Sequence, residues 1–426
     1  MSSEKANPLV VFLITIQQYK RPVRLAKILE ENGAKIALVF TFSVTDDENF
    51  KSNMMVSAKK TVESDVFDAG DPNFSFHFKK MIKENENIVF HLFAGQNFHV
   101  NESIKPIIHK IKDYTAKSIN SKLVLDFYDV YFAHKIASDI DDNKETREYD
   151  HYKIDLLTED NARTQVELYE MCDGLVARDL QWWVFRRCQG LKKIPSCFVP
   201  DLPGKINTKA LKTPHQEKIK IIQGGNVPNP VKNAVQSMYF IVKLLLQVNI
   251  KISFLLPLHY RRRNWSKSKI LDQWSDILSL SKERGDITLE ASILDSEVLE
   301  RRFSTADFGI HGVDGYVQAG IPKIARDKPV VALFCAGRLA DYAEAGLIIL
   351  GLEGLRLSRR ILQEHTTWVN LESALKIAEN GEDLHDYLAG ERSRHEEAAF
   401  ANAVTQRRVM AQRLIGFYES LFSKNA

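Results

Sequence analysis

Two glycine-bearing loops, each with a lysine nearby, are the segments of this sequence best suited to bind an anion. In the first, Gly224 and Gly225 follow the apolar run 219–222, and Lys232 stands at the start of the next helical stretch. Glycine lets the backbone approach a ligand closely, and helix-terminal N–H groups and a lysine ammonium both favour phosphate oxygens. We therefore predict a diphosphate site here, with a tight turn and a solvated lysine as the alternative.

The second loop follows the apolar run 308–311, and its candidate ligand-binding residues are His311, Gly312 and Lys323. Polar ligand contacts concentrate in loops at the carboxyl ends of strands. A mobile turn in which glycine supplies a positive φ is the alternative. The first loop lacks the GxGxxG spacing of dinucleotide-binding proteins, so we expect no nicotinamide cofactor.

Candidate bases lie in the first half of the chain. Asp126 and Asp129 stand at the end of a short apolar run, and His91 and His99 flank the end of another. A carboxylate or an imidazole at such a place can position or deprotonate an acceptor hydroxyl. For each of them the alternative is a helix cap or a satisfied polar group.

Short apolar runs alternate with helical stretches from residue 9 to about residue 370. Runs that are apolar throughout indicate strands buried on both faces, hence parallel sheets covered by helices. The segment 200–218 interrupts the pattern with three prolines and several lysines, and the pattern then begins again, so we place a linker at 204–218. We predict an α/β protein with an N-terminal domain at 1–203, a second domain at 219–395 and a C-terminal helix at 396–426. We read 367–422 as helical only, and expect the C-terminal helix to pack back on the N-terminal domain.

The composition narrows the class of protein. The 426 residues are 44% hydrophobic and 27% charged, as in ordinary globular proteins, and 58 Lys+Arg against 55 Asp+Glu leave a net charge of +3. A near-neutral balance argues against a dedicated nucleic-acid binder. Four cysteines without a CxxC pair predict neither a disulfide framework nor a zinc site. No run reaches about 18 apolar residues, so we expect a cytoplasmic protein.

The segment 182–193 mixes large aromatic side chains with four cations, and it begins at Trp182. Such a helix could dock at the inner face of a membrane that carries a lipid-linked acceptor. A helix with a buried aromatic face and a solvated basic face is the alternative. The acidic stretch 138–150 lacks the carboxylate spacing of a calcium loop, so no metal is expected there.

Together the two loops resemble the nucleotide-sugar-binding half of GT-B glycosyltransferases of the family-4-like type. In that family a strand, a glycine loop and a lysine open the C-terminal domain, and a lysine-bearing loop precedes a strand that here reads Pro-Val-Val-Ala at 329–332. Further similarity lies at 287–310, 172–178, 194–200 and 408–422. The resemblance implies two Rossmann-like, doubly wound domains that face each other across a cleft. It also implies metal-independent, retaining transfer of a hexose-type sugar from a nucleoside diphosphate sugar to a hydroxyl acceptor.

We therefore expect two groups of site residues and no cofactor. The acceptor is a glycan, a lipid-linked molecule or a protein. The pair of glutamates typical of the family is not found here, which leaves open a non-catalytic module that binds a partner or a glycan. A sugar-nucleotide epimerase on the same fold is the other alternative. The expected donor-binding residues are Gly224, Gly225, Lys232, His311, Gly312 and Lys323, and the expected catalytic residues are Asp126, Asp129 and His91.

Overall fold

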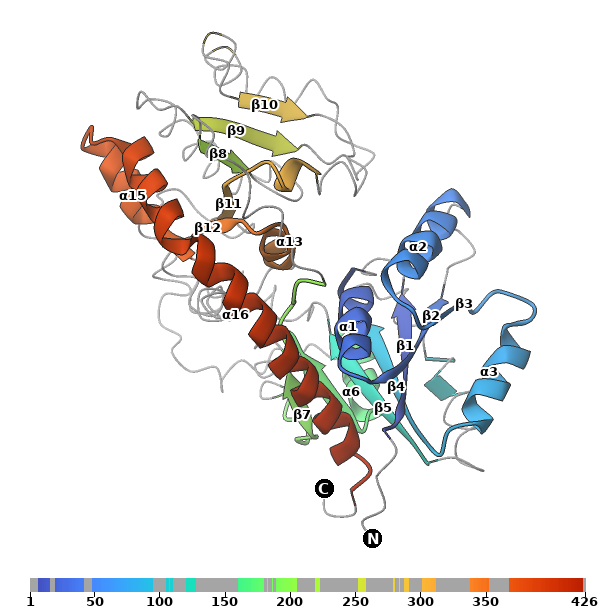
Figure 1. The fold of residues 1–426 in the computed structure, drawn as a ribbon. Helices are drawn as coiled ribbons and strands as arrows, with labels where there is room; N and C mark the ends of the chain where they lie inside the picture. Colours follow the sequence, from blue (N-terminus) through green and yellow to red (C-terminus); the bar gives the residue numbers. More distant parts are fainter. Residues whose placement is uncertain are drawn as a thin grey trace. The chain divides into compact units, whose positions relative to one another are not determined.

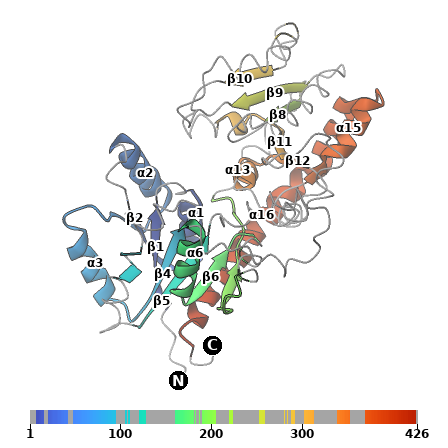
Figure 2. The ribbon, with the colours of Figure 1, turned by 180° about the vertical axis from the view of Figure 1, so that it is seen from behind.

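The computed structural model of the chain consists of two α/β units (Figures 1 and 2). The first unit comprises Met1–Gly204 and Arg407–Ala426, and the second comprises Lys205–Gln406. The structure describes residues 7–15, 20–41, 48–94, 105–106, 108–109, 120–127, 160–179, 182, 186, 189–204, 219–222, 252–257, 279, 283, 287–290, 301–311, 338–351 and 368–423.

A seven-stranded sheet forms the centre of the first unit, with the order β3-β2-β1-β4-β5-β6-β7. Every neighbouring pair in it is parallel. The strands are β1 (Leu9–Thr15), β2 (Lys35–Thr41), β3 (Asp65–Asp68), β4 (Asn87–Ala94), β5 (Asn120–Phe127), β6 (Gly174–Ala177) and β7 (Ser196–Phe198).

Burial on both faces explains why the central strands are apolar throughout. In β1, Phe12 belongs to the core cluster on one face of the sheet. Val11 and Leu13 point to the opposite face, because side chains alternate along a strand, and they are buried as well. The helices are α1 (Lys20–Glu31), α2 (Glu48–Thr61), α3 (Phe74–Lys83) and α6 (Asp160–Glu170). Helix α1 is followed by Gly33, whose φ of +82° suits glycine best, and the chain then turns into β2.

The last turns of helix α16 (Leu384–Ser420) complete the core of the first unit. Four apolar or aromatic residues on one helical face, Met410, Ala411, Leu414 and Tyr418, join the cluster that contains Phe12 of β1. The helix approaches β6 so closely that a Cβ on Gly174 would lie 2.9 Å from the Phe417 ring. The carboxyl end of α16 is thus part of the first unit.

Arg407 joins the two places where the chain leaves the first unit. Its Nη2 donates to the carbonyl oxygen of Gly204 at 2.6 Å and pairs with Oε2 of Glu31 in α1 at 2.7 Å. Gly204 is the last residue of the first segment of this unit, and Arg407 is the first residue of the second. The two segments are therefore held together at their ends by one guanidinium.

The second unit contains a six-stranded parallel sheet with the order β10-β9-β8-β11-β12-β13. Among its helices are α13 (Arg338–Ala345), α15 (Leu371–Glu379) and the beginning of α16. The reading of 367–422 as helical only is wrong at its start, because residues 368–370 form a short edge strand beside β12. The strands are β8 (Ile219–Ile222), β9 (Ile252–Pro257), β10 (Ile287–Glu290), β11 (Phe308–His311), β12 (Ile348–Gly351) and β13 (Trp368–Asn370).

The same strand order occurs in both units and confirms the predicted doubly wound class. When only the described strands are numbered within each unit, the first six run 3-2-1-4-5-6. The order therefore reverses between β1 and β4 and again between β8 and β11. Ligands of such sheets bind outside the carboxyl ends of the strands at this switch point. No helix among the described residues is long and apolar enough to cross a membrane.

Replacing Gly309 by alanine is expected to destabilise the second unit. A Cβ at this position of β11 would lie 2.6 Å from the ring of Tyr342, which is fully buried in α13 and donates a hydrogen bond to the Ile310 carbonyl. The ring must shift and lose that bond, so we expect a loss of about 1–3 kcal/mol in the free energy of unfolding, measured by urea denaturation. Gly416→Ala is the control, because nothing lies within 4 Å of its Cβ position. Equal stability of the two variants would contradict this packing.

Candidate functional site

The two predicted anion-binding loops begin at neighbouring strand ends in the second unit. Strand β8 ends at Ile222, which pairs with Gly309 of β11, and β11 ends two residues later at His311. Because the strands are parallel, their carboxyl ends lie at one edge of the sheet, on either side of the switch point. The structure therefore brings the starts of both loops together. Five of the expected donor-binding residues lie outside the described residues, namely Gly224, Gly225, Lys232, Gly312 and Lys323.

Asp307 fixes the register of β8 and β11 at the opposite end of the strands. Its Oδ2 accepts a hydrogen bond from the Lys220 amide at 2.8 Å, and its own amide donates to the Lys220 carbonyl at 2.8 Å. Its Oδ1 lies 2.6 Å from Nη1 of Arg392 in α16. This arrangement holds the two strands that carry the loops and connects them to α16.

In the first unit, the structure brings the predicted residues His91 and Asp126 together on the neighbouring strands β4 and β5. His91 lies on β4 and Asp126 on the neighbouring β5, and the pairing of Phe93 with Asp126 places all three side chains on one face. His91 Nε2 lies 3.5 Å from Asp126 Oδ2, and both side chains are fully buried. Asp129 and His99 lie outside the described residues.

Arg21, in the first turn of α1, is the centre of this buried cluster. Its Nε and Nη2 lie 3.0 Å and 2.9 Å from Asp126 Oδ2, and its Nη1 lies 2.6 Å from Oδ1 of Asp201. Nη2 also donates to the Val199 carbonyl at 2.8 Å. One guanidinium thus ties α1 to the end of β5 and to the segment after β7. Arg178, after β6, adds a second cation 3.8 Å from Asp201 Oδ2.

The charges in this cluster set the protonation state of His91 and its neighbours. Burial alone would raise the pKa of Asp126, but the Arg21 charge and the contact with His91 hold that pKa below its ordinary value. Burial lowers the pKa of His91 and raises that of Tyr418 well above its ordinary value. The carboxyl is therefore ionised at neutral pH, while the imidazole and the phenol are uncharged.

These states determine which ring nitrogen of His91 carries the proton. A carboxylate only accepts hydrogen bonds, so Nε2, which faces Asp126, carries the hydrogen. Nδ1 then accepts a hydrogen bond from the Tyr418 hydroxyl of α16 at 2.6 Å. The ring is stacked on Phe93 and meets Phe12 edge-on, with centroids 4.4 Å and 5.0 Å away. His91 is thus fixed between the sheet and the C-terminal helix.

The geometry of the cluster suits positioning more than proton transfer. Asp126 has a lowered pKa, is 1% exposed and shares one oxygen with a guanidinium, which makes it a weak proton acceptor. Three buried polar atoms, His91 Nε2, Asp126 Oδ1 and Asp201 Oδ2, have no hydrogen-bond partner within the described part of the chain. The catalytic role of His91 and Asp126 stays a prediction, and the observed contacts hold the carboxyl ends of β4 and β5.

Three residues of this cluster are not predicted by any sequence pattern, namely Arg21, Asp201 and Tyr418. Arg21 stands before Pro22 in a polar segment after the first apolar run, which reads as an ordinary helix start. Its partners Asp126 and Asp201 are 105 and 180 residues away along the chain. The fold brings these distant residues together, so no local signal could have found the part that Arg21 plays in the cluster.

The aromatic and basic segment 182–193 is described only in part. Trp182 and Arg186 are partly buried, and Lys192 and Lys193 are exposed. Lys192 and Lys193 lie in an irregular segment before β7 and not on a helix, so neither reading of a basic helix over 182–193 is tested by them. The acidic stretch 138–150 lies outside the described residues.

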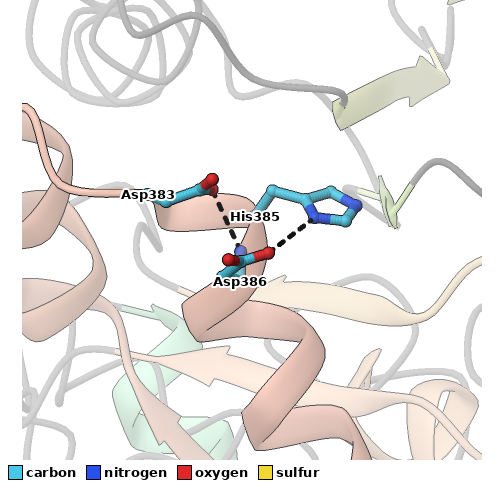
Figure 3. A group of neighbouring side chains, drawn as sticks. All are labelled: Asp383, His385 and Asp386. Carbon is cyan, nitrogen blue, oxygen red and sulfur yellow. Dashed lines mark hydrogen bonds and ion pairs between the residues drawn. The ribbon is translucent and has the colours of Figure 1, made fainter.

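Asp383, His385 and Asp386 form a group whose ligand atoms lie within 4.8 Å of one another (Figure 3). Asp383 precedes α16, and its Oδ1 accepts a hydrogen bond from the Asp386 amide at 3.1 Å. This is the contact of a helix N-cap. Asp386 Oδ1 lies 3.6 Å from His385 Nδ1. Both carboxylates are exposed, so capping accounts for the group without a metal ion.

The cluster around His91 is expected to make the first unit sensitive to acid. Above pH 6.5 the His91 ring is neutral in both the folded and the unfolded chain. Below pH 6.5 the ring is protonated in the unfolded chain but stays neutral in the folded chain, because burial lowers its pKa. The free energy of unfolding then falls by at most about 1.4 kcal/mol per pH unit until the folded pKa is reached. Urea denaturation between pH 7 and about pH 4.5 measures this slope.

His91→Asn is the matched control, because an amide oxygen can accept the Tyr418 hydrogen bond and does not titrate. Its stability should depend less on pH than that of the unchanged protein across this range. Parallel curves for the two proteins would show that His91 is not the titrating group. The ionised Asp126 carboxylate stabilises the fold above about pH 3.8. This contribution to the free energy of unfolding is lost as the pH falls below that value.

Comparisons with known proteins establish the fold. No family model and no curated protein matches the sequence. A glycosyltransferase structure from Rickettsia africae ESF-5 matches 99% of this chain and 100% of its own, at 10% identity and a TM-score of 0.53. The apo structure of OtsA matches 98% of this chain and 100% of its own, at 10% identity and a TM-score of 0.51. With its two doubly wound sheets, the chain has the two-domain GT-B fold.

Proposed function

We propose that this protein transfers a hexose-type sugar from a nucleoside diphosphate sugar to a hydroxyl acceptor. The observation that carries the proposal is the place of the two glycine-bearing loops, which begin after β8 and β11 on either side of the switch point of the second unit. The GT-B fold supports it, because the Rickettsia protein of the same fold is described as a glycosyltransferase.

In this proposal the second unit binds the donor. Backbone N–H groups at Gly224 and Gly225 contact the diphosphate, and Lys232 and Lys323 neutralise the charge that develops on it as the sugar leaves. Lysines and fixed N–H dipoles supply this stabilisation without a metal ion. His311 and Gly312, at the end of β11, contact the sugar nucleotide. We propose that the configuration at the sugar carbon is retained.

The first unit binds the acceptor in this proposal. The acceptor is a glycan, a lipid-linked molecule or a protein, and its hydroxyl is positioned by a carboxylate at the end of β5. Asp129 is our candidate for that carboxylate, since it follows the end of the strand by two residues. Arg21, Asp126 and His91 hold the strand ends from which this segment departs. In this proposal, the buried cluster holds the ends of the strands in place and takes no direct part in proton transfer.

A panel of UDP-, GDP-, ADP- and CMP-linked sugars tests the proposal by thermal shift. A donor at about 100 times its dissociation constant adds about 2.7 kcal/mol to the free energy of unfolding, which gives a clear rise in Tm. NAD is the control and should give no shift. If the folded protein is stabilised by none of the sugar nucleotides, the proposal is wrong. Stabilisation without nucleotide release to any acceptor would instead identify a binding module, and interconversion without acceptor an epimerase.

A further inference from the structure

Helix α3 presents an aromatic and basic face to solvent. Phe76 is 71% exposed, more than Val56 and Val409, the other exposed large hydrophobic residues of the described chain. Lys79, Lys80 and Lys83 follow it at spacings of three, four and seven residues. Residues so spaced lie on one side of a helix, so Phe76 and the three lysines share a surface. All three lysines are exposed.

The opposite side of α3 is held by the first unit. Phe78 packs near Phe90 of β4, with ring centroids 6.2 Å apart, and Phe74 packs near Phe67 of β3 at 6.1 Å. Ile82 is fully buried. The helix therefore has a core face of its own, and Phe76 contributes nothing to it. A single exposed apolar side chain is common on protein surfaces, so the charges around Phe76 decide what this face can bind.

The charge on this face is uncompensated within the helix. Helix α3 contains no acidic residue, and none of its three lysines forms an ion pair with any residue that the structure describes. The nearest acids in the sequence flank the helix. Asp71 bonds the Asn73 amide in the turn before it at 2.7 Å, and Glu84 is the C-cap residue after it. The exposed side of the helix itself is therefore positive.

We propose that this face of α3 docks on the surface of an anionic lipid bilayer. An aromatic ring enters the headgroup region while lysine side chains extend their ammonium groups to lipid phosphates, and each lysine near such a surface adds to the attraction. A protein partner fits less well, because lysine is depleted at the centres of protein–protein interfaces. Docking places the first unit, which binds the acceptor in the proposed reaction, at a membrane surface.

Vesicle sedimentation with the full chain tests the docking. The protein should bind vesicles that contain phosphatidylglycerol, bind pure phosphatidylcholine far less, and be released as salt is raised. Lys79→Gln/Lys80→Gln should weaken binding about 30-fold, and Phe76→Ser about 10-fold. Equal binding to both kinds of vesicle, or none to either, would overturn the proposal. The assay contains no sugar nucleotide, so its result is independent of the transfer reaction.

Helix α2 offers a matched control. There Val56 is 47% exposed, and Lys59 and Lys60 follow it at the same spacings as the first two lysines follow Phe76. Met54 of α2 packs in the core cluster on the other face of the sheet from α3. Lys59→Gln/Lys60→Gln should therefore leave vesicle binding unchanged. A loss as large as that of the α3 variant would show that total charge, not this face, decides binding.

A second measurement reports on residue 76 itself. Phe76→Trp changes an exposed ring for another ring and should not affect folding, because position 76 is 71% exposed. The added fluorescence should shift to shorter wavelength with phosphatidylglycerol vesicles, as the indole leaves water. Absence of that shift while the protein is bound would show that another surface makes the contact and would contradict the proposal.

Discussion

Arg21→Met is expected to lower the free energy of unfolding by about 3–5 kcal/mol, the largest loss of stability that we predict for a single substitution. The guanidinium is the shared partner of Asp126 and Asp201, and all three side chains are buried. Methionine fills a similar volume but leaves two carboxylates near each other without their common cation. Urea denaturation of the full chain measures the loss.

Arg163→Met is the control for this substitution. Arg163 is half exposed and lies 3.9 Å from Glu167 on the same helix, so loss of this ion pair should cost at most about 0.5 kcal/mol. Adding Asp126→Asn to Arg21→Met removes one of the two carboxylates that lost the Arg21 guanidinium, and it should recover part of the stability. Arg21→Met and Arg163→Met with equal, small effects would show that the buried cluster is not held by its charge.

Lys232→Ala is expected to lower kcat about 100- to 1,000-fold, as the loss of one group that stabilises transition-state charge usually does. In the proposed function this lysine meets the leaving diphosphate, whose charge grows as the sugar departs. Lys323→Ala should act in the same direction. The rate of nucleoside diphosphate release, with the donor that stabilises the protein, measures the effect.

Lys220→Ala is the control, because Lys220 lies near the amino end of β8, away from the first loop, and its backbone, not its side chain, holds Asp307. We expect its kcat to stay within about threefold, since its side chain is assigned no place at the diphosphate. An unchanged kcat in Lys232→Ala would remove this lysine from the mechanism.

Much of the fold could be predicted from the sequence, because strands that are buried on both faces appear in the sequence as continuous apolar runs. The run 219–222 coincides with β8, and 308–311 coincides with β11. Helix α2 carries a weak sequence signal, since Met54 and Ala58 are the only buried residues among its described side chains at 51–61. Strand β13 was missed because three residues at a sheet edge, next to a helix, carry no strand period.

The candidate sites differ in how far the sequence could predict them. The two glycine-bearing loops could be proposed because glycine, lysine and a preceding strand are neighbours in sequence, and their role in donor binding stays a prediction. The cluster in the first unit was found only in part. His91 and Asp126 were singled out by their place at strand ends, but their contact with Tyr418 joins residues 327 positions apart. Such contacts follow from packing of α16 on the sheet, and no local pattern encodes them.

Hydrogen exchange of the full chain with and without a nucleoside diphosphate tests the central claim most directly, because it needs neither an acceptor nor a known sugar. We predict slower exchange in peptides that contain the carboxyl ends of β8 and β11, from Ile222 to Lys232 and from His311 to Lys323, and little change in β4 and β5. Binding that slows exchange only in the first unit, or no change with any nucleoside diphosphate, would contradict the account.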